Sequence, residues 1–415
     1  MDLANGPKRR KFFMPSSGFT NIDFLSNNTK PVSLKLTKDD KSHSRKKLFI
    51  LASVVAVLIV VASSIVIPLI LLTQNESSTV PSKPNSKFNF VLLLVMQFHF
   101  ILAKLLIASG QTNDGKLTSV CEIVDLRNDT LCEPWPNLKI PVKGATGGFL
   151  QGGLLICGGN AVGSDSDWNL TNQCQHIKLD GTYTTNTNLS FPLIASSSTV
   201  INDRLLVTGG VSPNNVYGLN HVEFIDPDQK STLTHLPYKV ADHCVLSFDS
   251  TVMVTGGIDK ETGSVRRTTY KRSISEEDNW TIGPDMIEGR TWHGCGSFIL
   301  NGTVIPVVAG SENTNTLKTV ELLDQTLEKP IWVRGPDLLV SEPFGEFNRG
   351  HHIVSNGETL YYINTIQPLF LRLECSSIED CHWIELNREL LNPRNAGIVA
   401  LVPDELTDCS GNQKE

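Results

Sequence analysis

Cysteine and histidine are the residues of this chain whose types could support metal or redox chemistry. The sequence holds nine cysteines, all after Gly110, and ten histidines. Two groupings, His243 with Cys244 and His293 with Cys295, combine imidazole and thiolate, which are the usual ligands of zinc. However, no Cys-x-x-Cys pair occurs, and both groupings hold the same place in repeated segments. We therefore expect structural histidines, no metal and no other cofactor.

Acid–base catalysis and nucleotide binding are not indicated either. Hydrolysis of a glycosidic bond uses two carboxylates in one site, and no motif marks such a pair. A glycine-rich run covers residues 144–163, but no Gly-Lys-Ser/Thr follows it and no helix is predicted there to bind a phosphate. The sequence therefore predicts a protein without catalytic residues or enzymatic activity.

The elements that carry the cysteines and histidines recur about every fifty residues, which is the period of some propeller repeats. An alternating strand ends at Asp125, Asp226 and Asp324, and a further strand begins at Trp280 and Trp332 in the motif Trp-x-x-Gly-Pro-Asp. A strand of small and apolar residues closes each unit. The first strand of the unit is apolar and ends in glycine, and its five copies are LLIASG (105–110), LLICGG (154–159), LLVTGG (205–210), VMVTGG (252–257) and PVVAGS (306–311).

Six such units with four short strands each, and almost no helical periodicity, predict an all-β fold, a six-bladed β-propeller over residues 104–405. We expect the glycine strand to run next to the propeller axis, where a Cβ would clash with the neighbouring blade. The glycines to which this assigns a structural role are Gly110, Gly158, Gly159, Gly209, Gly210, Gly256, Gly257 and Gly310.

The repeated pattern resembles the kelch family of β-propellers. The resemblance rests on the glycine pair, the downstream tryptophan, and an Arg or His before the last strand, as in Arg290-Thr291-Trp292-His293, and it covers Lys104 to about Asp404. The segment GATGG and the paired cysteines are most similar to membrane-anchored or secreted extracellular kelch-like proteins of invertebrates. The resemblance implies that one blade is completed by strands from both chain ends, which would pair the strand after Lys104 with the last unit.

Two other classes share this architecture and remain alternatives. One is a cytosolic or membrane-tethered kelch adaptor, but the 103 residues before the propeller leave no room for the domains that recruit a ubiquitin ligase. The other is a propeller enzyme of the carbohydrate oxidase or glycosidase kind. The oxidases need two His and two Tyr ligands with a Cys beside one Tyr, and the six tyrosines of this chain show no such arrangement.

The cysteines are better explained as disulfides that join neighbouring strands or blades. One cysteine, Cys409, is left over, and it is an alternative partner for Cys132 if the C-terminal tail packs on the first unit. The pairs expected from the places of the cysteines in the units are Cys121 with Cys132, Cys157 with Cys174, Cys244 with Cys295, and Cys375 with Cys381.

The segment before the propeller predicts a single-pass membrane protein. Residues 48–72 are uncharged and almost wholly apolar, and as a helix they would be roughly 37 Å long against a hydrocarbon core of about 30 Å. Residues 1–47 form a basic tail, which places the N-terminus in the cytosol, and residues 73–89 form a polar stalk. A second apolar segment, 90–103, could span, pack or be cleaved, and residues 406–415 form a C-terminal tail. The topology is therefore type II, with the propeller extracellular or luminal.

Glycosylation signals agree with this topology, because Asn-x-Ser/Thr sequons are modified only in secreted or luminal segments. The first sequon lies in the predicted stalk, and five lie within or beside the propeller units. The six asparagines are Asn75, Asn128, Asn169, Asn188, Asn279 and Asn301.

We therefore expect a membrane-anchored binding module for a protein or glycan ligand, recognised by loops on a rigid scaffold. The acidic propeller, within a chain of net charge −7, argues against nucleic acid as a partner. The aromatic, arginine and histidine residues of the longer loops are the candidate contacts. They are Trp168, Tyr217, Arg290, Trp292, His293, Phe344, Phe347 and Arg349.

Overall fold

The computed structural model describes residues 104–127, 132, 134–162, 169–215, 218–274, 279–311, 317–340, 350–407 and 409. The predicted basic tail, membrane span, stalk and second apolar segment (1–103), and most of the C-terminal tail, lie outside these residues. Within the described ranges, no helix has both the length and the apolar character that crossing a membrane would need.

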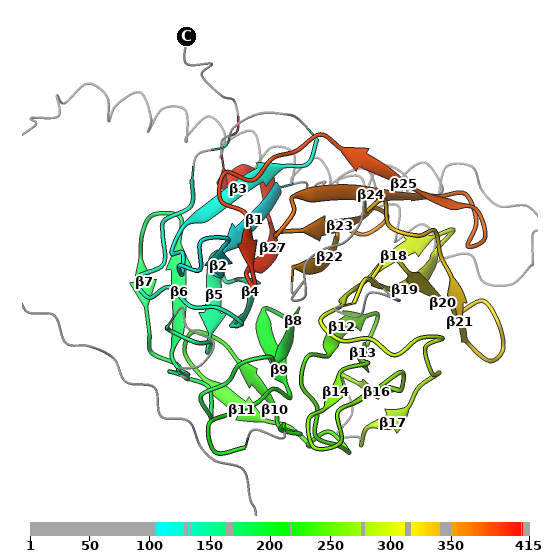
Figure 1. Cartoon of the computed structure of the whole chain (residues 1–415), viewed down its shortest axis with the longest axis horizontal. Helices are drawn as coiled ribbons and strands as arrows, with labels where there is room; N and C mark the ends of the chain where they lie inside the picture. The colour runs from blue at the N-terminus through cyan, green and yellow to red at the C-terminus, as the bar shows by residue number, and fades with distance from the viewer. Residues whose placement is uncertain are drawn as a thin grey trace, which may run out of the picture. The chain divides into compact units, whose positions relative to one another are not determined.

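Six antiparallel sheets follow one another around a central axis as the blades of a β-propeller (Figure 1). From the innermost strand outward, blade 1 is β27 (Ile398–Val402), β1 (Lys104–Ala108) and β3 (Cys121–Asp125); blade 2 is β4 (Thr146–Leu150), β5 (Gly153–Cys157), β6 (Cys174–Lys178) and β7 (Tyr183–Thr184); blade 3 is β8 (Ser197–Ile201), β9 (Arg204–Thr208), β10 (Val222–Ile225) and β11 (Lys230–Thr232); blade 4 is β12 (Cys244–Phe248), β13 (Thr251–Thr255), β16 (Thr269–Ser273) and β17 (Thr281–Ile282); blade 5 is β18 (Gly294–Leu300), β19 (Thr303–Ala309), β20 (Val320–Asp324) and β21 (Ile331–Arg334); and blade 6 is β22 (His351–Ser355), β23 (Leu360–Asn364), β24 (Leu369–Cys375) and β25 (Cys381–Leu386).

Five short elements complete the described chain. The loop between β13 and β16 forms its own hairpin, β14 (Ile258–Asp259) with β15 (Ser264–Val265). Strand β2 (Gln111–Thr112) pairs with β26 (Arg394–Asn395), and a single turn of 3-10 helix, η1 (Asp404–Leu406), follows the last strand. These elements lie in connections and leave the six sheets unchanged.

The glycine strand is the second strand of blades 1 to 5, not the innermost one, and this corrects the expectation from the sequence. The copies LLICGG and LLVTGG are β5 and β9, and each is hydrogen-bonded on both edges. Their apolar side chains are buried because neighbouring blades cover both faces of the sheet. The innermost strands are the segments of small residues, such as β4 and β8, which fit the crowded axis.

The glycines that end the second strands are nevertheless structural. Gly209 and Gly256 have φ angles of 58° and 59°, in the left-handed region that favours glycine. A Cβ at Gly209 would lie 2.6 Å from the His243 ring, and a Cβ at Gly256 would lie 2.6 Å from the Arg290 carbonyl oxygen. Both contacts belong to the segment that leads into the next blade, so glycine is required for blades to pack.

Strands from both ends of the described propeller close the ring, as the sequence predicts. Strand β1 pairs antiparallel with β27, from Lys104 opposite Val402 to Ala108 opposite Ile398. The buried Lys104 Nζ also donates a hydrogen bond to the Asp404 carbonyl over 2.9 Å. Strand β27 thus covers the inner edge of β1, which would otherwise be open to pairing with another chain.

Four disulfides reinforce the propeller. Cys157–Cys174 and Cys375–Cys381 join paired strands within blades 2 and 6, and Cys244–Cys295 joins the innermost strands of blades 4 and 5. The expected pair of Cys121 with Cys132 is wrong, because Cys132 is bonded to Cys409, the alternative that the sequence left open. Cys121 is a buried free thiol inside blade 1, where β3 directs it into the apolar core.

Candidate functional site

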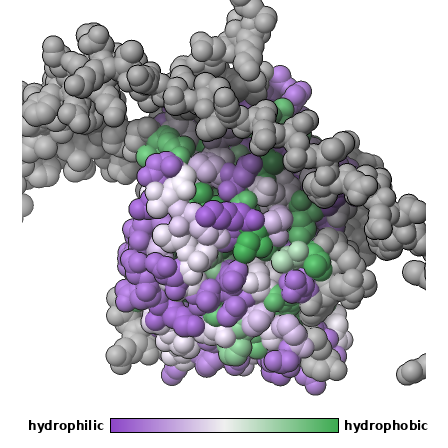
Figure 2. Space-filling view, turned by 90° about the vertical axis from the view of Figure 1, so that its left-hand side faces the viewer, coloured by the Kyte–Doolittle hydropathy of each residue, from purple (hydrophilic) through white to green (hydrophobic). Residues whose placement is uncertain are grey.

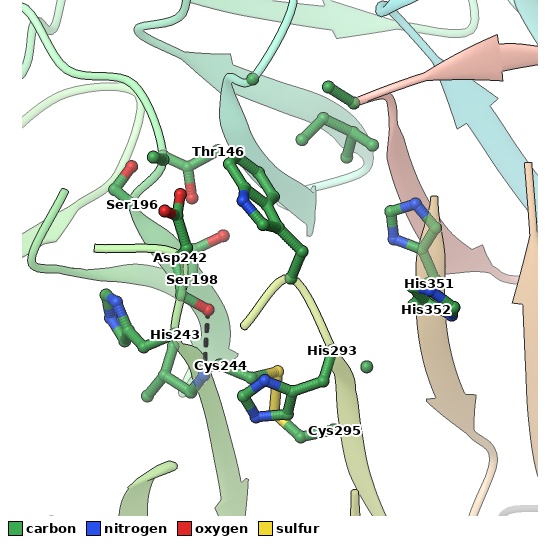
Figure 3. A pocket seen from close by; sticks show the side chains of 18 of the residues that line it. Thr146, Ser196, Ser198, Asp242, His243, Cys244, His293, Cys295, His351 and His352 are labelled. Carbon is green, nitrogen blue, oxygen red and sulfur yellow. Dashed lines mark hydrogen bonds between the residues drawn. A yellow bond between two sulfur atoms is a disulfide. The ribbon is translucent and has the colours of Figure 1, made fainter. Parts of the chain in front are cut away.

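The six innermost strands begin around a cavity of about 200 Å³ on the propeller axis. We call the face of the propeller at which these strands begin the cavity face. Figure 3 shows Thr146, Ser196, Asp242 and His293 around this cavity, each from a different blade or the segment leading into it. A second cavity of about 230 Å³ follows further along the innermost strands, and half of its lining residues are serine or threonine. The axis therefore contains two cavities with polar and apolar lining and is not a packed apolar core.

A ring of left-handed residues surrounds the start of the first cavity. Residues at equivalent positions before the innermost strands have φ angles of 62° (Gly144), 59° (Ala195), 57° (Asp242), 54° (Trp292) and 52° (Ala396). Backbone hydrogen bonds link them from blade to blade: Gly144 donates to Ala396 over 3.0 Å, Asp242 to Ala195 over 3.0 Å and Trp292 to Asp242 over 2.9 Å. Glycine, alanine and aspartate are small, whereas Trp292 is a bulky residue in a conformation that side chains of its size rarely adopt. Its backbone is held there by the neighbouring blades.

Charge in the cavity is balanced. The Asp242 carboxylate is buried and forms an ion pair with Lys260, whose side chain is one-third exposed. Lys260 follows β14, in the loop between β13 and β16, so the longest hairpin of blade 4 reaches over the start of the cavity. The negative charge of Asp242 is thus neutralised by the positive charge of Lys260 beside Trp292.

The histidines next to the cavity pack between blades. The rings of His243 and His293 lie against Gly209 and Gly256 of the preceding blades, and their Nε2 atoms are 2.8 Å from the hydroxyls of Thr208 and Thr255. His351 shares a hydrogen bond of 2.6 Å between its Nδ1 and the Tyr362 hydroxyl. The positions of these rings agree with the structural role that the sequence predicts.

Burial keeps these imidazoles neutral. Loss of solvation lowers the pKa of His243 and His351 to about 3 and that of His352 to about 4, and it lowers the pKa of His293 well below its ordinary value. In the described part of the chain, no three His, Cys, Asp or Glu side chains come together in a way that could hold a metal ion. At neutral pH the histidine rings beside the cavity are therefore uncharged.

One candidate contact residue, Arg290, is instead part of the packing, which corrects the prediction. Arg290 is fully buried and donates to Glu321 over 2.8 Å and to the carbonyls of Gly310 and Thr319 over 2.9 and 2.8 Å. His293 is 4% exposed and bonded as described above. Arg394 and Glu122 repeat the Arg290–Glu321 pair in blade 1. These charged residues clamp one blade to the next and do not face a ligand.

Trp292 and His293 are the candidate contacts that line the cavity, where Trp292 is half-buried and His293 is almost fully buried. The other five candidates, Trp168, Tyr217, Phe344, Phe347 and Arg349, lie outside the described residues. Their described neighbours Asn169, Gly218 and Gly350 all belong to connections on the cavity face, because second strands end and innermost strands begin there. Sequence reasoning missed Asp242 and Lys260, whose proximity depends on the β14–β15 hairpin.

Comparison with known proteins supports the fold alone. Neither a protein-family model nor a curated protein sequence matches the chain. Among solved structures, 334 chains match. The fold is that of a propeller. One match, titled "Structure of YjhT", superposes with a TM-score of 0.53 and 14% sequence identity, and it covers 66% of this chain and 96% of that chain.

The described sequon asparagines are accessible for modification. Asn169, Asn188, Asn279 and Asn301 are all exposed. Asn75 and Asn128 lie outside the described residues. Asn301 occupies the hairpin between β18 and β19, at the face opposite the cavity face, and Asn279 directly precedes the outermost strand of blade 4. None of these four asparagines lines the axial cavity.

Proposed function

We propose that this chain is a kelch-type propeller, anchored in a membrane by residues 48–72, that binds a protein or glycan ligand outside the cell or in a lumen without transforming it. Four disulfides support an oxidising compartment, where such bonds persist. The exposed sequon asparagines are compatible with the same compartment. The basic residues before the apolar segment support a cytosolic N-terminus.

Kelch identity is supported by contacts that recur from blade to blade. The indole N–H of a tryptophan in or directly before the outermost strand donates to a carbonyl of the preceding blade: Trp280 to Thr234 over 3.1 Å, Trp332 to Pro284 over 3.0 Å and Trp383 to Pro336 over 2.9 Å. The glycine pair and the Arg–Glu clamp also recur at fixed places in the blade. The motif residues of the repeat therefore have the same task in several blades.

The chain enters the described propeller at the face opposite the cavity face. Lys104, where the described propeller begins, lies at the end of β1 opposite Val402, whereas Ala108 lies opposite Ile398, which lines the cavity.

The conformation and the position of Trp292 are the main support for a binding role. A bulky aromatic side chain is held in the left-handed region at the start of the axial cavity, where other blades have glycine, alanine or aspartate. Residues kept in strained conformations by their surroundings cluster at binding sites. Aromatic side chains are also frequent anchors of binding energy, because they bury a large surface with few torsions to restrict.

The test compares two variants of the full chain on the surface of transfected cells. Trp292→Gly removes the ring and suits the backbone, and Ala195→Gly makes the same backbone change at the equivalent place in blade 3. Probed with arrays of glycans and of secreted proteins, the unmodified chain and Ala195→Gly should retain the same ligand, and Trp292→Gly should lose it. Removal of N-glycans should increase gel mobility. Retention by Trp292→Gly would exclude the cavity as the binding site, and an unglycosylated chain would exclude the proposed compartment.

A further inference from the structure

Six equivalent turns on the cavity face lead from the outermost strand of one blade to the innermost strand of the next. Each turn buries one apolar side chain between two blades. In five turns, the backbone N–H of this buried residue donates a hydrogen bond to a carbonyl of the blade that the turn leaves, in the loop after the second strand, over 2.8 to 2.9 Å. These hydrogen bonds show that five of the turns are structurally equivalent, and the sixth, with Leu390, has the same place between blades 6 and 1. The buried residues are Leu138, Leu189, Leu236, Met286, Leu338 and Leu390.

The residues on either side of this buried position divide the propeller into two halves. In three consecutive turns, an acidic residue precedes the buried residue and an aliphatic residue follows it. These turns connect blade 4 to 5, blade 5 to 6 and blade 6 to 1. The aliphatic side chains are 40%, 50% and 75% exposed for Ile287, Leu339 and Leu391. The acidic residues are Asp285, Asp337 and Glu389, and all three are exposed. We call these six residues the acidic–aliphatic arc.

The other three turns have a different character. Asn137 and Lys139, Asn188 and Ser190, and His235 and Pro237 occupy the same places there. One of these residues, Asn188, belongs to a sequon, so a glycan would stand in this half. The side of the propeller that carries β7 is largely hydrophilic with small apolar areas (Figure 2). Exposed aliphatic residues at this position are therefore confined to the arc.

The arc is presented on a rigid backbone. Ile287 donates its N–H to Glu321 over 2.6 Å, and Leu391 donates to Glu122 over 2.8 Å. Each glutamate is itself bound by a buried arginine of the Arg–Glu clamp. Because the backbone under these exposed side chains is already fixed, a partner that covers them loses little conformational freedom of the loop.

The charges of the arc indicate what would cover it. Asp337 and Glu389 form no ion pair with any residue that the structure describes, and Asp285 has only a surface pair with Arg267 at 3.4 Å, of the kind that contributes little. Aliphatic side chains between carboxylates complement a surface on which lysine or arginine alternates with aliphatic residues. The acidic balance of the chain would also speed the approach of such a basic partner.

We propose that the acidic–aliphatic arc docks a protein segment that presents lysine or arginine next to aliphatic side chains. This proposal names the partner class of the binding function proposed above and rests on it. Leu391, the most exposed large apolar side chain among the described residues, would be the main anchor. The acidic residues would set the orientation and the rate of encounter.

The test uses the full chain in nanodiscs and a short synthetic peptide of lysine and leucine that carries a photoreactive leucine analogue. Cross-links located by mass spectrometry should concentrate at 285–287, 337–339 and 389–391. The triple variant Ile287→Ser, Leu339→Ser, Leu391→Ser should lower labelling about ten-fold or more, which corresponds to about 1.4 kcal/mol or more. The matched variant Lys139→Ser, Pro237→Ser in the other half should label like the unmodified chain. A glutamate–leucine peptide should label weakly.

Three outcomes would overturn the proposal. They are labelling spread evenly over both halves, equal labelling by the glutamate–leucine peptide, and a self-associated chain whose assembly disappears in the triple variant, which would assign the arc to a second copy. The change in gel mobility of the same sample on removal of N-glycans tests the compartment. Loss of the ligand in Trp292→Gly tests the cavity as a binding site. Failure of the arc is thereby distinguished from failure of the binding function.

Discussion

Trp292 donates its backbone N–H to the carbonyl of Asp242 over 2.9 Å, and both residues are in the left-handed region. The bond joins the segments that lead into blades 4 and 5, close to the disulfide Cys244–Cys295. Through it, the two side chains of the axial cavity with the most distinctive chemistry, an indole and a carboxylate, are fixed relative to each other. The cavity is therefore built by blade packing and not by one loop.

Removing Arg290 should destabilise the propeller strongly. Its ion pair with Glu321 is fully buried on both sides. Loss of one partner leaves a buried carboxylate without its counter-charge, so Arg290→Ala should lower the free energy of unfolding by about 3–5 kcal/mol. The control is Arg334→Ala, which removes an exposed pair with Glu288 and should cost about 1 kcal/mol or less. Equal shifts in denaturant midpoint for the two variants would contradict the clamp role.

Glycine at position 256 should be needed for its lack of a side chain as well as for its backbone angle. Gly256→Ala would introduce a Cβ 2.6 Å from the Arg290 carbonyl, in addition to left-handed strain. Gly263→Ala has similar strain at φ +71° but meets no atom within 4 Å. The strain alone costs about 1–2 kcal/mol, so unfolding experiments should find Gly256→Ala clearly less stable than Gly263→Ala. Similar losses would argue that the blade interface adjusts.

The cysteines should separate into one free thiol and four bonded pairs. Non-reducing peptide mapping should recover Cys132 linked to Cys409, and Cys121 should be alkylated only after unfolding. Cys409→Ser should lower stability by about 2–4 kcal/mol, because this bond closes a very long loop. Cys121→Ser should have a smaller effect, that of placing a hydroxyl in an apolar core. A peptide containing Cys121 linked to Cys132 would refute this pairing.

Stability should fall in mild acid because of the neutral histidines. The folded-state pKa of His243 and His351 is about 3, whereas an unfolded histidine has a pKa of about 6.5. Between these values the unfolded chain binds more protons, so the stabilising contribution is complete above about pH 6.5 and declines as the pH falls toward 3. Each such histidine should contribute a slope of about 1.4 kcal/mol per pH unit within this window.

Urea titrations between pH 7 and pH 5 can measure this slope. His243→Gln should flatten the pH dependence, even if it lowers the stability at pH 7. His382→Gln makes the same substitution at an exposed position of β25 and is the matched control. An unchanged slope in His243→Gln would mean that this imidazole is accessible to protons in the folded state.

The strand content was predictable because it depends on local patterns, and the pairing of strands from both ends of the propeller was implied by the resemblance to kelch propellers. Alternating and apolar runs such as VELLD and LLVTGG specify strands through their own burial. Repetition of the unit then requires a ring of blades. The position of the glycine strand was predicted wrongly, because a tandem repeat has no intrinsic starting point. Only hydrogen bonds such as those between β8 and β9 show where one blade ends.

The candidate site was less accessible to sequence reasoning. Arg290 and His293 were chosen for their chemistry, but burial against Glu321 and Thr255 gives both a packing role. Asp242 and Lys260 were missed, because they meet only through a hairpin that folds over the axis. The arc was also not visible in the sequence, since its residues become neighbours only when blades 4, 5, 6 and 1 stand side by side.

The sequence by itself determined the repeat, the number of blades, most of the cysteine pairs and the acidic character of the propeller, because each of these follows from residue types at short or regular separations. The tertiary structure alone decided the phase of the blades, the bond between Cys132 and Cys409, and the ring of left-handed residues around the cavity. These features join residues from different blades or from opposite ends of the described propeller. Their proximity is set by the closure of the whole ring, which no local pattern encodes.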